Sequence, residues 1–184
     1  MATFRSLIAL LCAAAAFPSS AQAPFVWIEG ESPQAVAGAK IEPSSSKPGI
    51  LSGSKWMTYS IPSGAKPDTA VMLTYSVTVP KPGRFVPWFR IGFEWVRADM
   101  AYRFDGGAWN SMPATRTTTN VIELGVWSEV AWDHGIATPL RAGKRKLDVR
   151  FAVPKSSDRF LFGLDCIALV PEGTPFRPDN ALKP

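Results

Sequence analysis

Apolar and polar residues alternate along two stretches of the chain. Between Val71 and Val79 every second residue is apolar, and the residues between them are polar except for Met72. Residues 146–153 repeat the pattern. A period of two with one polar face is typical of a strand in an antiparallel sheet whose other face is buried. No window has a convincing helical period, so the pattern predicts a chain built of strands.

Further segments have the composition of short strands. They are residues 25–29, 56–61, 84–93, 98–104, 127–132 and 160–170. The turn Asp105-Gly106-Gly107 predicts a hairpin into the strand that follows it. So many short strands, joined by loops rich in Pro, Gly and Ser, predict an all-β fold of two packed sheets. Within this β-sandwich class we prefer a jelly roll, although alternation alone does not separate it from an immunoglobulin-like strand order.

The N-terminus has the features of a secretory leader. Arg5 precedes an apolar run of residues 7–17, and Ala21-Gln22-Ala23 supplies small residues where a signal peptidase cuts. We therefore expect residues 1–23 to be a signal peptide, residues 24–178 to form one β-sandwich domain and residues 179–184 to be a tail. The protein should be secreted or periplasmic. Outside the leader, the sequence has no apolar run long enough to span a membrane.

Composition narrows the possible partners and chemistry. The formal net charge is +5, but the basic residues are scattered apart from residues 141–146. Nucleic acid is therefore not expected as a partner, whereas a polyanionic glycan stays open. After removal of the leader one cysteine remains, Cys166, which lies in an apolar stretch and should be a small buried residue. The protein then needs no disulfide.

Catalytic motifs are weak. The single histidine, His134, lies in a turn, and no Gly-x-Ser-x-Gly motif accompanies it. A glycosidase needs two carboxylates at a set separation, but the sequence positions of the acids give no reason to expect such a pair. The acids from which one could be drawn are Glu94, Asp99, Asp105, Glu123 and Glu129.

Three other carboxylates suggest a metal site. Glu29 and Glu31 are two residues apart on a predicted strand and point to the same side. Asp165 lies in an apolar strand, where a carboxylate needs a partner. If the first and last strands pair, the three acids converge and suit a structural Ca²⁺ ion. Alternatively, Glu29 and Glu31 are exposed and Asp165 accepts hydrogen bonds from an arginine or from backbone N–H groups.

The chain has seven tryptophans. Trp88 lies in a strongly apolar segment and should be part of the core. Four others lie near predicted loops or strand ends, where an exposed indole could stack on a sugar ring: Trp132, Trp109, Trp127 and Trp56. The alternative for each of them is that the ring fills the core.

A series of motifs recurs in a known order along the chain. They are Trp27-Ile28-Glu29-Gly30-Glu31, Leu51-Ser52-Gly53-Ser54-Lys55-Trp56, Pro82-Gly83-Arg84-Phe85 with Trp88 and Arg90, Phe104-Asp105-Gly106-Gly107-Ala108-Trp109, Trp132, residues 140–147, and Leu164-Asp165-Cys166-Ile167. The series resembles galactose-binding-like jelly rolls. It is similar to the carbohydrate-binding modules of families 6 and 35 over nearly all of residues 25–178.

The resemblance implies a binding site and a metal site. It places a structural Ca²⁺ between Glu29, Glu31 and Asp165, and a sugar in loops at one end of the sandwich. Trp132 and Trp109 are the best positional matches for the sugar-binding rings. These modules often carry an asparagine two residues before the last-strand aspartate, where this chain has Gly163. That departure puts the usual cleft in doubt.

The function implied is secreted, non-catalytic binding of a polysaccharide or oligosaccharide, in association with secreted glycan-degrading enzymes. Two alternatives remain. One is a secreted module for protein–protein interaction or for structure in the cell envelope, without sugar binding. The other is a small glycan-active enzyme, which would need two carboxylates facing one cleft.

Overall fold

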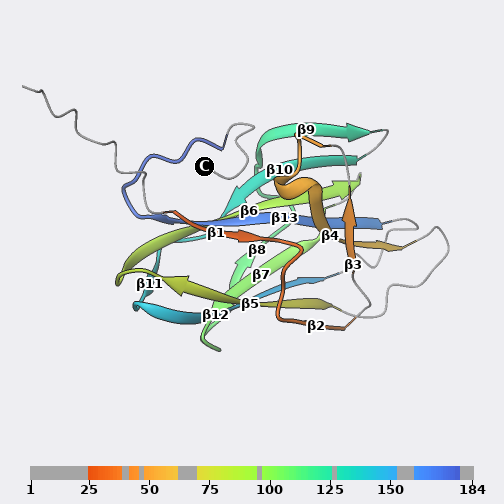
Figure 1. Ribbon diagram of the computed structural model, residues 1–184. Helices are drawn as coiled ribbons and strands as arrows, with labels where there is room; N and C mark the ends of the chain where they lie inside the picture. The colour runs from red at the N-terminus through yellow and green to blue at the C-terminus, as the bar shows by residue number, and fades with distance from the viewer. Residues whose placement is uncertain are drawn as a thin grey trace, which may run out of the picture.

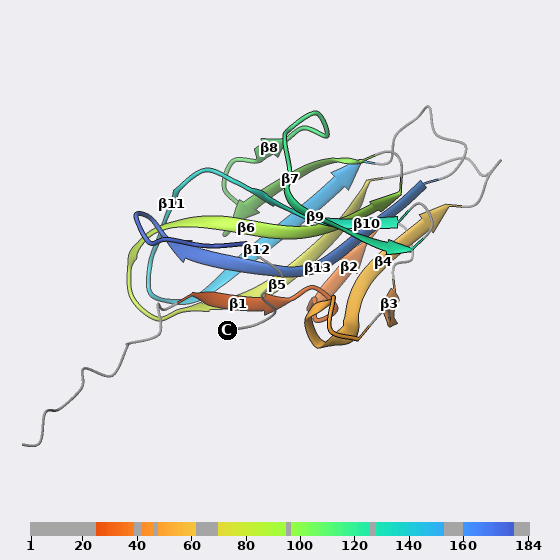
Figure 2. The same cartoon turned by 90° about the horizontal axis from the view of Figure 1, so that it is seen from above.

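The computed structural model describes residues 25–38, 42–45, 48–61, 70–94, 97–125, 128–152 and 160–178. The expected leader, the expected tail and Trp127 lie outside these ranges. The described chain forms two antiparallel sheets that face each other, as Figures 1 and 2 show from two directions. The predicted all-β sandwich is confirmed. No helix in this part of the chain could cross a membrane.

The larger sheet has eight strands in the order β3-β4-β13-β6-β10-β9, with β1 beside β13 and β11 beside β6. Its strands are β1 (Val26–Glu29), β3 (Glu42–Ser45), β4 (Lys55–Ile61), β6 (Gly83–Glu94), β9 (Thr119–Gly125), β10 (Ser128–His134), β11 (Thr138–Leu140) and β13 (Phe160–Pro171). A single 3₁₀ turn, η1 (Ser52–Ser54), leads into β4. The expected pairing of the first strand with the last is confirmed, with Glu29 opposite Cys166.

The smaller sheet has five strands in the order β2-β5-β12-β7-β8. They are β2 (Ala35–Ala37), β5 (Val71–Val79), β7 (Asp99–Phe104), β8 (Asn110–Met112) and β12 (Gly143–Ala152). The predicted hairpin joins β7 to β8, and Asp105 and Gly106 adopt φ angles of 52° and 73° in its turn. Consecutive residues with positive φ are the geometry that a tight hairpin turn requires.

The main core lies between the two sheets. The alternate apolar residues of β5, from Val71 to Val79, are all buried there, as the sequence pattern predicts. Phe151 of β12 stacks on Phe162 of β13 across the interior, with ring centroids 3.7 Å apart. Burial of these side chains is the main favourable contribution to folding.

The larger sheet is also covered on its outer face. There Trp132, Cys166 and Val170 are buried beneath partly exposed aromatic residues, among them Trp27 and Phe176. Figure 1 shows the C-terminal segment, in blue, passing over β13 on this side. A strand covered on both faces has no polar side, which explains why residues 84–93 and 160–170 are apolar almost throughout.

Candidate functional site

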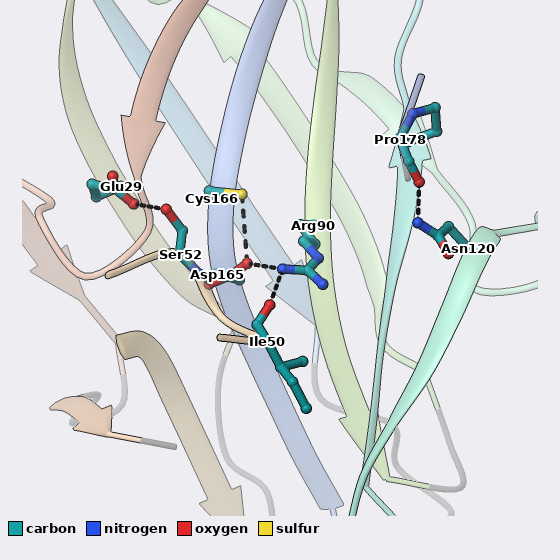
Figure 3. Close-up of polar contacts among 8 residues, drawn as sticks. All are labelled: Glu29, Ile50, Ser52, Arg90, Asn120, Asp165, Cys166 and Pro178. Atoms are coloured by element: carbon teal, nitrogen blue, oxygen red, sulfur yellow. Dashed lines mark hydrogen bonds and ion pairs between the residues drawn. The ribbon is translucent and has the colours of Figure 1, made fainter. Parts of the chain in front are cut away.

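A buried polar cluster lies on the outer face of the larger sheet, where β13 passes η1 (Figure 3). Asp165 is fully buried, and its two oxygens accept hydrogen bonds from Ser52 N at 2.8 Å and from Arg90 Nη1 at 2.9 Å. Arg90 is itself only 1% exposed, and the same nitrogen donates to the carbonyl oxygen of Ile50. Asp165 therefore accepts hydrogen bonds from an arginine and from a backbone N–H group. The sequence analysis gave this arrangement as the alternative to a metal.

Burial dominates the titration of this cluster. It raises the pKa of Asp165 from 3.8 to about 6, although the Arg90 guanidinium and the Ser52 N–H oppose the rise. Burial also raises the pKa of the Cys166 thiol, which donates to Asp165 at 3.5 Å. Cys166 is therefore a buried, protonated residue without thiolate character, as the sequence predicts.

Glu29 and Glu31 lie at the edge of the same cluster. Ser52 Oγ donates to Glu29 Oε2 at 2.6 Å, so one serine bridges Glu29 and Asp165 through its hydroxyl and its backbone N–H. Burial, with the neighbouring Glu29 charge, raises the pKa of Glu31. The Oε2 atom of Glu31 is buried and has no hydrogen-bond partner. A cation would satisfy that orphaned oxygen.

The three carboxylates do not form a preassembled metal cage. Within the described ranges, no group of three His, Cys, Asp or Glu residues is placed to hold a metal ion. Asp165 already faces the guanidinium of Arg90, so the donor set that fits a cation is reduced to Glu29 and Glu31. Calcium binding by this chain stays a prediction.

Two of the four candidate sugar-binding tryptophans are buried. Trp132 is 1% exposed and packs edge-on against Trp27 and Phe176. Trp56 is 5% exposed and lies against Leu51 and Leu124 in a second outer cluster. The expectation that Trp132 and Trp56 present open ring faces at the rim is wrong, because loops and the C-terminal segment cover them.

The position of Trp56 also explains Gly163. A Cβ atom at Gly163 would lie 2.6 Å from the Trp56 ring, and one at Gly92 would lie 2.1 Å from it. These two glycines face each other across β13 and β6. The indole therefore lies flat on the sheet where side chains would otherwise stand, and an asparagine at position 163 does not fit beneath it.

Trp109 is the one described candidate that stays partly exposed. It lies at the start of β8, and its ring is 4.3 Å from the guanidinium carbon of Arg103 and 4.7 Å from that of Arg150. These are cation–π contacts. Trp109 belongs to the outer face of the smaller sheet.

A cavity of about 610 Å³ opens at the end of the sandwich where β6 begins and β7 ends. Its walls come from the β7–β8 turn, from residues 136–141 around β11, and from the start of β12. Phe104, Pro139 and Leu140 give it apolar surface, while Asp105 and Asn110 add polar groups. Small-molecule sites commonly have this volume and this mixture of surfaces.

Specific hydrogen bonds hold the cavity walls in place. The hydroxyl of Tyr102 accepts from Ile136 N at 2.9 Å and fixes the loop between β10 and β11. Gly135 is required here, since a Cβ atom would lie 2.2 Å from that hydroxyl. On the opposite wall, Asp105 accepts from Lys146 N at 2.9 Å and pairs with Arg145 at 3.3 Å. The buried Nε of Arg145 has no partner.

The acids considered for glycoside hydrolysis do not meet in the cavity. Among the described residues that line the cavity, Asp105 is the one carboxylate, and its oxygens are engaged by Lys146 and Arg145. Glu123 and Glu129 are cross-strand partners on β9 and β10, away from the cavity. The cavity residues themselves were not predicted from the sequence. In the sequence, the only features noted in this region were the Asp105-Gly106-Gly107 turn and the basic stretch 141–146.

Comparison with known proteins identifies the fold. No family model matches the chain, and no curated protein matches it. Among solved structures it is similar to a CBM35-containing β-(1,4)-mannanase of Podospora anserina, with 14% identity, a TM-score of 0.51, and 85% of this chain but 29% of that chain covered. It is also similar to the C-terminal CBM6 of a marine laminarinase, LamC, from Zobellia galactanivorans, with 12% identity, a TM-score of 0.50, and 79% and 98% coverage.

The chain has a jelly-roll fold like that of these carbohydrate-binding modules. The insecticidal crystal protein Cry2Aa has a similar domain, with 12% identity, a TM-score of 0.55, and 80% of this chain and 21% of that chain covered. The chain thus spans less than a third of the mannanase and of the crystal protein. Because one fold serves several functions, the function has to be argued from the site.

Proposed function

We propose that this chain is a non-catalytic carbohydrate-binding module that acts outside the cytoplasm and holds a saccharide in the end cavity. The leader pattern of residues 1–23 supports the location. The observation that supports binding is the cavity of about 610 Å³, whose walls come from separate loops and present both apolar and polar groups. The fold it shares with carbohydrate-binding modules supports the ligand class. Association with secreted glycan-degrading enzymes belongs to the same proposal.

The cavity surfaces suit a sugar ring. A saccharide has apolar C–H faces, which the exposed side chains of Ile136 and Pro139 can cover, and hydroxyl groups, which the Asn110 amide can bind. A single engaged carboxylate, Asp105, does not provide the acid and base pair of a glycosidase. The site therefore supports retention of the ligand without its hydrolysis.

The structure offers little support for docking of a protein partner through an apolar face. In the described part of the chain, the exposed large hydrophobic residues are Val36, Val121 and Ile136. Val36 lies on β2, Val121 on β9 and Ile136 in the loop between β10 and β11, so they form no common patch. Of the three, Ile136 lies in the cavity lining.

Two neighbouring residues of β8 give a matched test. Asn110 lines the cavity, while Ser111, the next residue, faces the other side of the sheet. A glycan array should identify saccharides that the wild-type protein retains. Asn110→Ala should weaken their binding about tenfold, since it removes a hydrogen bond in a partly desolvated site, and Ser111→Ala should not. Equal binding by both variants, or an array without any retained glycan, would contradict the proposal.

Calcium is a second component of the proposal. Glu29 and Glu31 would hold the ion with carboxylate oxygens, and the ion would be the partner that the buried Oε2 of Glu31 lacks. Asp165 would act indirectly, by fixing Ser52 beside Glu29. The ion would have a structural role, joining the start of the chain to the last strand.

Removal of calcium should therefore lower the melting temperature. A ligand that binds only the folded state stabilises it by mass action, so wild-type protein should melt several degrees lower in EDTA than in millimolar CaCl₂. Glu31→Gln should melt at the same temperature in both buffers. A wild-type melting temperature that does not depend on the buffer would remove the calcium site and leave the cavity proposal intact.

A further inference from the structure

The outer face of the five-stranded sheet carries a row of basic side chains. On β12, Leu147, Val149 and Phe151 point into the core. The residues that alternate with them therefore point outward, and of these Lys144, Lys146 and Arg150 are exposed. Alternate residues on a strand are spaced about 7 Å apart. Arg103 adds a fourth cation from the neighbouring strand β7.

Hydroxyl groups run parallel to this row. The pairing of β12 with β5 places Thr78 opposite Lys144 and Ser76 opposite Lys146. Both hydroxyl residues are exposed on the same face. The surface thus offers hydrogen-bonding groups beside positive charges over the length of two strands.

The carboxylates on this face do not cancel its charge. Asp148 is fully buried under its partners: Arg103 Nε donates to it at 2.9 Å, Thr74 Oγ1 at 2.8 Å, and Lys146 Nζ lies at 3.2 Å. Burial acts to raise the pKa of Asp148, but these contacts outweigh it and hold the pKa below the usual value. Asp99, at the far end of β7, accepts from Ala114 N. The described face has four cations and two carboxylates.

Trp109 fixes two of these cations. Its ring lies within 5 Å of the guanidinium carbons of both Arg103 and Arg150, and Arg103 is also held by Asp148. A guanidinium stacked on an indole still has N–H groups at its own edge that can donate to an anion. Because the stacking already restricts the side chain, it loses less conformational freedom when it binds. The two arginines are therefore positioned in advance.

We propose that this face is a second binding surface, separate from the end cavity, and that its ligand is an acidic polysaccharide. A polymer with carboxylate or sulfate groups at regular intervals matches the repeated cations of β12. Its hydroxyl groups match Ser76 and Thr78. These side chains are exposed along neighbouring strands, where an extended chain can reach them. The proposal does not depend on whether the cavity binds a sugar.

The test is calorimetric titration with soluble polygalacturonate, with uncharged galactan as the comparison. Wild-type protein should bind polygalacturonate and not galactan, and binding should weaken steeply toward about 0.5 M NaCl because salt screens exposed charges. Lys144→Gln/Arg150→Gln should weaken binding at least about tenfold. Neither residue is among the groups that hold Asp148, so the fold should be kept, which a thermal melt checks.

The matched control is Lys55→Gln/Arg177→Gln, which removes the same charge from exposed positions on β4 of the larger sheet and in the C-terminal segment. It should leave binding within about twofold of the wild-type value. Asn110→Ala should also leave it unchanged, which separates this surface from the cavity. Equal losses in the two double variants, or no binding at low salt, would overturn the proposal. Equal affinity for a DNA duplex through the same residues would overturn the choice of polysaccharide.

Discussion

Gly163 and Gly92 determine what the outer face of the larger sheet can do. Without side chains, they let the Trp56 indole lie directly on the backbone of β13 and β6. The indole is buried as a result, and the space beside Asp165 is filled by protein. From the sequence, Gly163 was only a departure from a family pattern. The structure shows that it is a packing requirement.

Restoring the family's asparagine should therefore harm the fold. Gly163→Asn should lower the free energy of unfolding by about 1–3 kcal/mol or more, the range for overpacked cores, because its Cβ would lie 2.6 Å from the Trp56 ring. Urea unfolding measures the change. Gly125→Asn is the control, since nothing lies within 4 Å of a Cβ built there. Equal stability of the two variants would contradict the packing account.

Asp165 should make stability depend on pH. Its pKa is raised from 3.8 to about 6 in the folded protein, so between these values the folded state binds a proton that the unfolded state releases. The free energy of unfolding should then increase as the pH falls from 7 toward 4, and the gain should be lost as the pH rises through 6.

Asp165→Asn should flatten that dependence. Glu31, whose pKa is also raised, keeps a smaller slope of the same sign. Urea unfolding at several pH values between 4 and 7 compares the two proteins. Identical slopes in wild type and variant would show that Asp165 does not titrate in this window.

The strands differ in how clearly the sequence shows them. β5 and β12 have one face in the core and one directed outward, so alternation predicted β5 to the residue and most of β12, which begins at Gly143 and not at Lys146. β2, β8 and β11 have three residues each, too few to show a period. The burial of Trp132 and Trp56 could not be predicted, because it depends on η1 and the C-terminal segment, which have no periodic pattern of their own.

The C-terminal segment is fixed by contacts far apart in the sequence. Phe176 packs 5.4 Å from the ring of Trp132 and 5.0 Å from that of Trp88. Asn120 of β9 donates to the carbonyl oxygen of Pro178, as Figure 3 shows. These contacts cover a face that the sequence alone left available for a ligand.

One hydroxyl links the sheet to the wall of the cavity. Tyr102→Phe removes the acceptor of Ile136 N, and the loss of such a partly buried hydrogen bond costs about 0.5–1.5 kcal/mol. Amide exchange of residues 135–140 should become faster, and cavity ligands should bind more weakly. The control is Tyr59→Phe, at a partly buried tyrosine that packs against the core elsewhere. Unchanged exchange in Tyr102→Phe would show that this bond does not order the loop.

The whole molecule presents two different surfaces on one β-sandwich. The sandwich brings the β7–β8 turn, β11 and the start of β12 together at one end. Along β12, side-chain alternation sends Arg145 to that cavity, and Lys144 and Lys146 to the outer face of the sheet. The sequence pattern placed Lys146 on the polar face of its strand but did not predict this division of the basic stretch. Only the packing of the two sheets shows where the cavity lies.

The most direct test of the central claim is an NMR titration of the isotope-labelled domain with a saccharide that the glycan array identifies. We predict that the amide shifts change in two groups, residues 104–110 and residues 136–145, which form the cavity walls. Changes confined to residues around Trp56 and β4, or no changes at saturating saccharide, would contradict binding in the end cavity.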